Sequence, residues 1–153
     1  ISKESRVLII GAGGAAKGIV FAMKQEGYSS ITITNRTIER AETLAQSLGK
    51  QAMTLDEASE QLDSCDILSQ TTSVGMQHSI QGVPLDLANL RSDAIVTDII
   101  YTPKETEFLR LARQKGAKTM NGLGMFIHQG ALAFSYWTNR YPDAQSLMNE
   151  WNN

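Results

Sequence analysis

The sequence lacks the features that define several specialised classes of protein. Cys65 is the only cysteine, which excludes an internal disulfide or a zinc cluster and favours a reducing, cytoplasmic setting. Lys and Arg number 14 against 16 Asp and Glu, a balance that argues against a general affinity for nucleic acid or an anionic membrane. No run approaches the ~20 apolar residues that a membrane helix needs. The two histidines, His78 and His128, lie in unlike contexts and predict no metal site.

The length of 153 residues suits one domain, since domains usually contain roughly 100–200 residues. The chain starts without an apolar segment behind a basic stretch, so no secretory signal is expected. It also starts without methionine, which indicates a fragment or a trimmed chain. We therefore expect one domain over residues 1–153.

Apolar segments and turn residues alternate along the chain. Short apolar or β-branched runs predict strands at residues 6–10, 30–34, 52–53, 66–69, 94–97 and 118–120. Apolar residues at helical spacing predict helices at residues 14–26, 37–48, 55–62, 105–115, 125–136 and 143–151. This alternation predicts an α/β fold, a Rossmann-type doubly wound and mainly parallel sheet of about six strands with helices on both faces. The long irregular stretch at residues 73–84 is typical of a functional loop.

The segment from Gly11 to Ala16 fits the pattern G-x-G-x-x-A and lies between a predicted strand and a predicted helix. Gly11 permits a tight turn, Gly13 lets the backbone approach a pyrophosphate, and the small Ala16 allows close packing of helix on strand. The free N–H groups at the helix start bind the anion. The predicted dinucleotide contacts here are Gly11, Ala12, Gly13, Gly14 and Ala15. A glycine turn that merely links two elements would not need three small residues at this spacing.

The end of the second predicted strand indicates which dinucleotide binds. NAD-binding domains usually carry an Asp or Glu there, about 20 residues beyond the glycines, to hold the ribose 2′-hydroxyl. This chain instead has Asn35, Arg36 and Thr37, and its first acid is Glu39. The planar Arg36 guanidinium suits a 2′-phosphate, and Arg40 lies about one helical turn away. The pattern predicts NADP as the cofactor, the alternative for Arg36 being a solvated surface residue. Thr37 can also cap the next helix, a role that is compatible with cofactor binding.

Five short motifs occur along the chain. They are Gly11–Ala15, Asn35–Thr37, Thr72–Ser73 with Gly75–Met76, Asp98–Pro103 with Thr106, and Gly122–Met125 with Gln129. In residues and order they resemble the motifs of shikimate dehydrogenases, and the resemblance covers the chain from about residue 3 to residue 136. It implies an oxidoreductase that reversibly reduces 3-dehydroshikimate to shikimate with NADPH, in the pathway through chorismate to the aromatic amino acids.

The resemblance also implies a division of labour between two domains. In the family, an N-terminal domain binds substrate and supplies a catalytic Lys and Asp, and a C-terminal Rossmann domain binds the cofactor. This chain resembles only the second domain, so no catalytic residue is expected in it, and neither Lys17 nor Asp98 is given that role. The chain alone is expected to be inactive. A homodimer is compatible with the family.

Further contacts are carried over from the family position by position. Those implied for the cofactor are Thr72, Ser73, Val74, Ile99, Gly122 and Met125. Tyr101 and Gln129 would reach the substrate. From the residues themselves, Tyr101 stands in an odd place for a core aromatic, and Gln129 shares a helix face with Met125, where a buried polar group needs a partner. Met125 is equally compatible with core packing. Gln70 replaces the Asn more usual in the family, and we expect a shift in the local loop bonding.

Two other functions stay open on this reasoning. One is a quinate/shikimate dehydrogenase paralogue, but such paralogues often prefer NAD through an acid near position 36, where this chain has Arg36. The other is a stand-alone NADP-binding regulatory module. Tyr101 and Gln129 argue against it, because a pure nucleotide sensor has no reason to keep substrate contacts.

Overall fold

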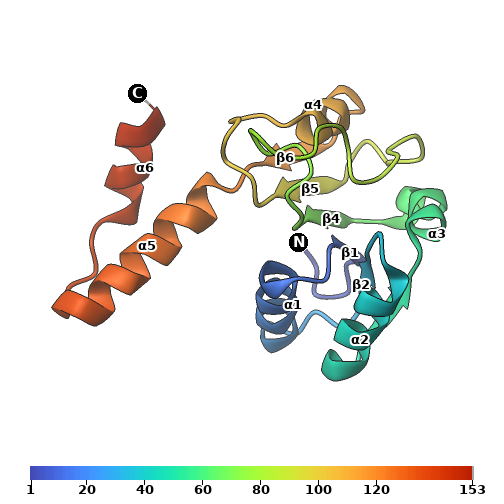
Figure 1. Ribbon diagram of the computed structural model, residues 1–153, viewed down its shortest axis with the longest axis horizontal. Coiled ribbons are helices and arrows are strands. Elements are labelled where there is room, and N and C mark those ends of the chain that lie inside the picture. The colour runs from blue at the N-terminus through green and yellow to red at the C-terminus, as the bar shows by residue number, and fades with distance from the viewer. Residues whose placement is uncertain (153) are drawn as a thin grey trace.

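Six short strands form one parallel sheet in the computed structural model, which describes residues 1–152 (Figure 1). The strands are β1 (Val7–Ile10), β2 (Ile31–Thr34), β3 (Gln51–Met53), β4 (Ile67–Gln70), β5 (Ile95–Asp98) and β6 (Lys118–Met120). They are ordered β3-β2-β1-β4-β5-β6, and every neighbouring pair is parallel. This is the strand order of a Rossmann sheet, so the predicted fold class is confirmed.

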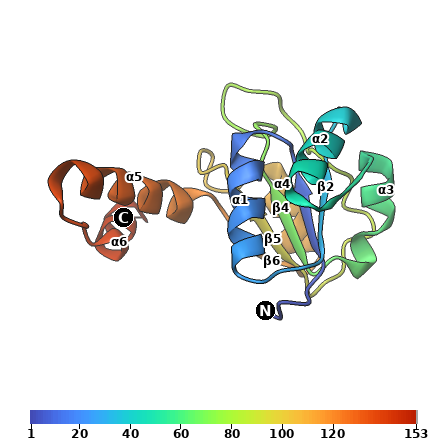
Figure 2. The ribbon, with the colours of Figure 1, turned by 90° about the horizontal axis from the view of Figure 1, so that it is seen from below.

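Helices cover both faces of the sheet, as predicted. They are α1 (Gly14–Gln25), α2 (Ile38–Leu48), α3 (Leu55–Glu60), α4 (Glu107–Gln114), α5 (Leu123–Thr138) and α6 (Ala144–Asn152), with a 3₁₀ turn η1 (Leu62–Ser64). α1 and α2 pack on one face, and α3, α4 and residues 85–94 pack on the other. Figure 2 shows α1 and α3 on opposite sides of the strands. The single helix predicted at residues 55–62 is in fact two elements, α3 and the 3₁₀ turn η1.

Strand β1 contributes to two separate cores. Val7 and Ile9 join the apolar cluster under α1 and α2, whereas Leu8 and Ile10 join the cluster under α3 and α4. Successive side chains of a strand point to opposite faces, which explains this division. All four residues are buried. Burial on both faces accounts for the uninterrupted apolar run in the sequence.

Several predicted element boundaries are wrong by one or two residues. β4 and β5 each end one residue later than predicted, so the buried Gln70 and Asp98 are their last residues. α4 begins at Glu107, two residues later than predicted, because Thr106 is its N-cap. α5 begins at Leu123, two residues earlier than predicted, directly after the strand-end turn. The polar residues at these misplaced boundaries, Gln70, Asp98 and Thr106, lie near the site described below.

α5 and α6 form a helical hairpin, here called the arm (residues 123–152), that projects away from the sheet (Figure 1, Figure 2). Leu123, Ile127, Ala131 and Ala144 give the arm a small core of its own. Large apolar side chains remain exposed on it: Met125, Phe126, Leu132, Phe134, Tyr136, Trp137, Tyr141, Leu147 and Trp151. None of the helices within residues 1–152 has the length and apolar character to cross a membrane.

Candidate functional site

The strand ends bring the predicted site segments to one edge of the sheet. The turn after β1, the segment Asn35–Thr37 after β2 and residues 71–74 after β4 all follow carboxyl ends, as do Ile99–Tyr101 after β5 and Gly122 after β6. In a sheet of this order, ligands bind in the crevice between β1 and β4, where the strand order reverses. The predicted segments surround that crevice.

A groove of about 500 Å³ lies at this position. Ten of the fifteen predicted cofactor contacts line it: Gly11, Ala12, Gly13, Asn35, Arg36, Thr37, Arg40, Thr72, Ser73 and Val74. Three segments that are far apart in the sequence thus share one cavity. Their contact with a cofactor stays a prediction.

The turn after β1 fits the pyrophosphate of a dinucleotide. Gly11 has a φ of 113°, which residues with a Cβ rarely adopt, and a Cβ there would also overlap Thr71 Oγ1. The Thr71 hydroxyl donates to the Ile10 carbonyl at 2.7 Å and so fixes the turn against β4. α1 begins after Gly13 without a side-chain cap and without an acid in its first turn. Its first N–H groups are therefore left for an anion.

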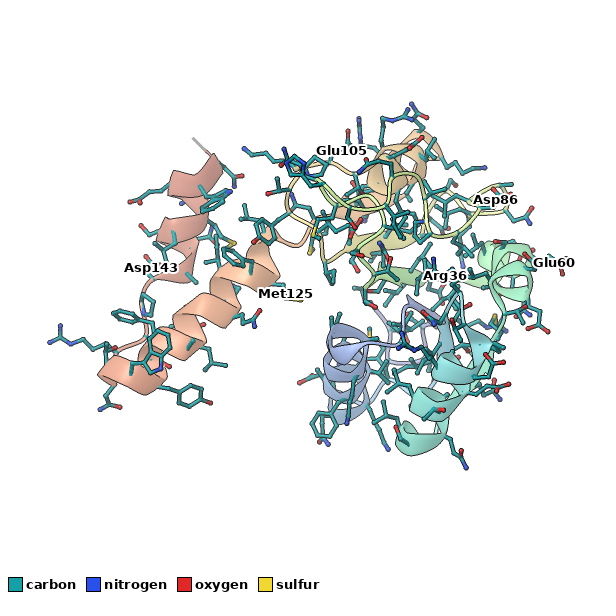
Figure 3. The ribbon with its side chains drawn as sticks, viewed as in Figure 1. Arg36, Glu60, Asp86, Glu105, Met125 and Asp143 are labelled. Carbon is teal, nitrogen blue, oxygen red and sulfur yellow. The ribbon has the colours of Figure 1, made fainter. Side chains whose placement is uncertain are left out.

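The ribose end of the groove carries two arginines. Arg36 lies beside the start of α2 (Figure 3), and both Arg36 and Arg40 are exposed in the groove wall. Neither forms an ion pair with a carboxylate within residues 1–152. Asn35 Nδ2 donates to the Thr37 carbonyl at 3.0 Å and stiffens the segment between them. Two free guanidinium groups on one wall suit a phosphate.

The side-chain cap that the sequence offered as an alternative role for Thr37 does not form. Thr37 is the N-cap of α2 by position, but its side chain makes no capping bond. The Arg40 N–H donates instead to the Thr37 main-chain carbonyl at 3.1 Å, which satisfies the amide that the hydroxyl would otherwise bind. The Thr37 hydroxyl is therefore left for a ligand in the groove.

A second cavity of about 550 Å³ adjoins the groove, since Thr71, Thr72 and Ser73 line both. Ile99 and Tyr101 also line this second cavity. The Tyr101 ring stacks on Phe126 at the base of the arm, with 4.5 Å between the ring centroids. Tyr101 is therefore packed on one side and lines the second cavity, and its contact with a substrate stays a prediction.

Gln70 organises the loop between the two cavities. Its side chain is fully buried, and its Nε2 donates to the carbonyls of Thr72 at 3.2 Å and Val74 at 3.1 Å. Its Oε1 accepts the Thr72 N–H at 2.8 Å. All of these bonds go to the main chain of the loop that lines the groove. The longer amide side chain thus fixes the conformation of residues 72–74.

Three of the remaining predicted contacts lie next to these cavities. Gly14 and Ala15 begin α1 directly behind the turn. Gly122 donates its N–H to the Ile100 carbonyl at 2.9 Å, and a Cβ on Gly122 would overlap the carbonyl of Ile99. The absence of a side chain at Gly122 therefore allows α5 to start against the segment that lines the second cavity.

Met125 and Gln129 are placed differently from what the sequence suggested. Both lie on α5, and both are exposed rather than buried on an apolar face. Met125 lies on the side of α5 that faces the sheet (Figure 3), and 44% of it is exposed. Neither residue lines the groove or the second cavity. Their assigned contacts stay predictions.

Sequence reasoning missed seven residues of the groove wall. They are Ile10, Leu55, Thr71, Ile80, Gln81, Val83 and Pro84. Thr71 had a usable signal, because it is a polar residue directly after a buried strand next to β1. The residues at positions 80–84 belong to the long irregular loop. Its length indicated a functional loop, but the sequence did not indicate which of its side chains face the groove.

The structure gives no sign of metal or thiol chemistry at the site. Within the described part of the chain, no group of three or more His, Cys, Asp or Glu side chains is placed to hold a metal ion. Burial raises the pKa of the Cys65 thiol to about 12. Cys65 is therefore a small buried apolar residue rather than a nucleophile.

A Rossmann sheet with a glycine turn and a groove at its crevice is typical of dinucleotide-binding domains. Comparison with known proteins then identifies the family. Residues 1–101 match the family described as shikimate / quinate 5-dehydrogenase, and residues 122–150 match the shikimate 5′-dehydrogenase C-terminal domain. The chain belongs to the shikimate/quinate dehydrogenase family.

Several relatives are similar over almost the whole chain. The shikimate dehydrogenase (NADP(+)) of Lysinibacillus sphaericus is 46% identical over 147 residues, which are 95% of this chain and 53% of that protein. The structure of shikimate 5-dehydrogenase from Thermus thermophilus in complex with NADP(H) and shikimate is 35% identical with a TM-score of 0.83, covering 95% of this chain and 53% of the other. Quinate dehydrogenase from Corynebacterium glutamicum in complex with NAD is 28% identical with a TM-score of 0.85, covering 96% and 54%. The chain spans about half the length of the curated relatives it matches.

Proposed function

We propose that this chain binds NADP(H) and is the cofactor-binding half of a shikimate dehydrogenase. The observation that carries the proposal is the groove between β1 and β4. It joins an uncapped helix start to two arginines that have no acidic partner among residues 1–152. A turn that merely links β1 to α1 would need neither the open backbone at Gly13 nor the guanidinium groups of Arg36 and Arg40. The Lysinibacillus relative, a shikimate dehydrogenase (NADP(+)), supports the same cofactor.

In this proposal each part of the cavity binds one part of NADP. The N–H groups at the start of α1 bind the pyrophosphate. Arg36 and Arg40 pair with the 2′-phosphate of the adenosine ribose. Residues 72–74 follow the cofactor towards the second cavity, where Ile99 in the cavity wall and Gly122 next to it contact the nicotinamide ring. The walls are already in place, so little ordering has to accompany binding.

The proposed contribution of this chain to the reaction is positioning. The bound cofactor supplies or accepts the hydride. Tyr101 and Gln129 contact the substrate, shikimate or 3-dehydroshikimate, and Met125 packs beside the nicotinamide. Holding donor and acceptor in line contributes strongly to the rate, whereas proton transfer needs an acid–base group that we assign to a second half of the enzyme. We also propose that the protein is cytoplasmic. Assembly into homodimers stays a prediction.

The exposed apolar surface of the arm is proposed to pack against that second half. In the Lysinibacillus relative, 147 matched residues are 53% of the protein, so about 130 of its residues lie outside the match. The arm exposes 82% of Trp137 and 52% of Trp151, and the groove of about 620 Å³ between α5 and α6 is lined almost entirely by apolar side chains. Apolar surfaces of this kind usually mark an interface. Trp137 and Trp151 would then be its anchors.

An activity measurement with two proteins tests the proposal. One is this chain, and the other is this chain fused to the unmatched half of the Lysinibacillus relative, with that half alone as the control. With shikimate and NADP⁺, the fusion should form NADPH and the chain alone should not. Acrylamide should quench the tryptophan fluorescence of the chain strongly and that of the fusion weakly. Turnover by the chain alone would show that an essential acid–base group lies within these residues, against the proposal.

Two alternatives give different results in the same assay. A quinate/shikimate dehydrogenase paralogue is favoured by the likeness to the Corynebacterium quinate dehydrogenase with NAD. It would make the fusion turn over quinate with NAD⁺ faster than shikimate with NADP⁺. Arg36, at the position of the usual acid, opposes that outcome. A stand-alone NADP-binding module would leave the folded fusion inactive although it binds NADP⁺.

A further inference from the structure

Asp98, the last residue of β5, is the only buried charged residue among residues 1–152. Only 3% of it is exposed, and no lysine, arginine or histidine of the described chain pairs with it. One carboxylate oxygen accepts the Ile100 N–H at 3.0 Å, and the other accepts the Thr106 hydroxyl at 2.8 Å. Burial raises the pKa of this carboxyl, while these two hydrogen bonds act in the opposite direction. A buried carboxylate is costly, so its position next to the site calls for a reason.

Thr106 connects three parts of the structure. Its hydroxyl donates to Asp98 and accepts the Leu109 N–H at 3.3 Å as the N-cap of α4. A Cβ added at Gly75 would lie 3.6 Å from its Cβ, so Thr106 also lies beside the loop at residues 73–84. Only 1% of Thr106 is exposed, and it lines neither cavity. Thr106 therefore acts on the site only through its neighbours.

The segment held by this pair is the wall of the second cavity. The Ile99 N–H donates to the Gln70 carbonyl at 3.1 Å, and the Ile100 carbonyl accepts the Gly122 N–H at 2.9 Å. Hydrogen bonds thus hold Ile99 and Ile100 to Gln70 at the end of β4, to Gly122 just before α5, and to Asp98. Asp98 is held in turn by Thr106, the N-cap of α4. Ile99, Ile100 and Tyr101 all line the second cavity. The position of that wall thus depends on Asp98 and Thr106.

We infer that Asp98 and Thr106 are positioning residues for the nicotinamide half of the cofactor. They hold the Ile99–Tyr101 wall in the conformation that the ring requires, although neither touches a ligand. This inference rests on the proposed binding of NADP(H). A purely structural helix cap would stabilise the whole domain and would affect all parts of the cofactor alike. A positioning pair acts selectively on the part that contacts the wall.

The test compares two ligands that differ only in the nicotinamide. NADP⁺ and 2′-phospho-ADP-ribose, which lacks the ring, are titrated by calorimetry into the wild-type chain, Thr106→Val and Thr106→Ser. Valine keeps the shape of threonine without the hydroxyl, and serine keeps the hydroxyl. We expect the wild type to bind NADP⁺ more tightly than the ring-free ligand. Thr106→Val should weaken NADP⁺ by up to about tenfold, the size expected for a residue that affects binding without touching the ligand, and should leave the ring-free ligand unchanged. Thr106→Ser should restore the difference.

Each other outcome has a defined meaning. Equal affinity of the wild type for both ligands would overturn the inference, because the wall would then not hold the ring. Equal weakening of both ligands in Thr106→Val, or no weakening, would also overturn it. Wild type that binds neither ligand would instead contradict the proposed function. If Thr106→Val does not fold, Asp98→Asn replaces it. That variant keeps an acceptor for the Ile100 N–H but loses the charge, and it should weaken NADP⁺ selectively.

Discussion

Replacing Arg36 by alanine removes one of the two guanidinium groups at the ribose end of the groove. A charge-assisted contact is typically worth about 1.5–3 kcal/mol. Arg36 is exposed, so water and salt screen it, and we expect the lower part of that range, about 1.5–2 kcal/mol. This corresponds to roughly a 10- to 30-fold loss of NADP⁺ affinity. NAD⁺ has no 2′-phosphate, so its affinity should hardly change.

Calorimetric titration of both cofactors into wild type and Arg36→Ala measures this loss. Arg110→Ala is a control, because Arg110 has 43% of its side chain exposed, lines neither cavity and, within residues 1–152, forms an ion pair only with Glu107 at 3.7 Å. Raising the salt concentration from about 50 to 500 mM should reduce the NADP⁺ preference of the wild type, since the pair is screened. If NADP⁺ and NAD⁺ weaken alike in Arg36→Ala, Arg36 supports the loop rather than binding the phosphate, and the reasoning is refuted.

Three further predictions concern single residues. Gly11→Ala should abolish measurable binding of either cofactor, because its Cβ would overlap Thr71 Oγ1 at a φ of 113°; unchanged affinity in calorimetry would contradict this. Burial raises the pKa of Asp98 in the folded state, so its contribution to stability is present below the unfolded pKa and is lost as pH rises through the folded pKa. In urea unfolding, Asp98→Asn should therefore gain stability relative to wild type as the pH rises above the ordinary carboxyl pKa of about 4, and a constant difference would exclude the effect. Cys65, with a pKa of about 12, should react with iodoacetamide far more slowly in the native chain than in urea at about pH 8, and fast native labelling would show that the thiol is not buried.

The sequence was sufficient to predict the sheet and the phosphate turn. Short buried strands, glycine stops and the spacing of the motif are local signals, and they survive in the structure as β1, the Gly11 turn and α1. The placement of Arg36 and Arg40 on one wall also follows locally, because Arg36 directly precedes the N-cap of α2 and Arg40 lies in the first turn of that helix. These parts of the site depend on few long-range contacts.

Two other parts of the site could not be predicted. Thr71 and the residues at positions 80–84 reach the groove through an irregular connection with no periodicity to read. The orientation of α5 was also inaccessible, because its apolar composition suggested burial, whereas the helix leaves the sheet and exposes Met125 and Gln129. Gln70 and Asp98 were placed just outside their strands, since polar residues at strand ends resemble loop residues until their buried hydrogen bonds are known.

The affinity of this chain for NADP⁺ and NAD⁺, measured side by side at one salt concentration, tests the central claim most directly. The uncapped start of α1 should bind the pyrophosphate of both cofactors, and only NADP⁺ brings a 2′-phosphate to Arg36 and Arg40. We predict a Kd for NADP⁺ at least about tenfold lower than that for NAD⁺. Equal affinities, a tighter NAD⁺ complex, or no binding of either cofactor by the folded chain would contradict the account.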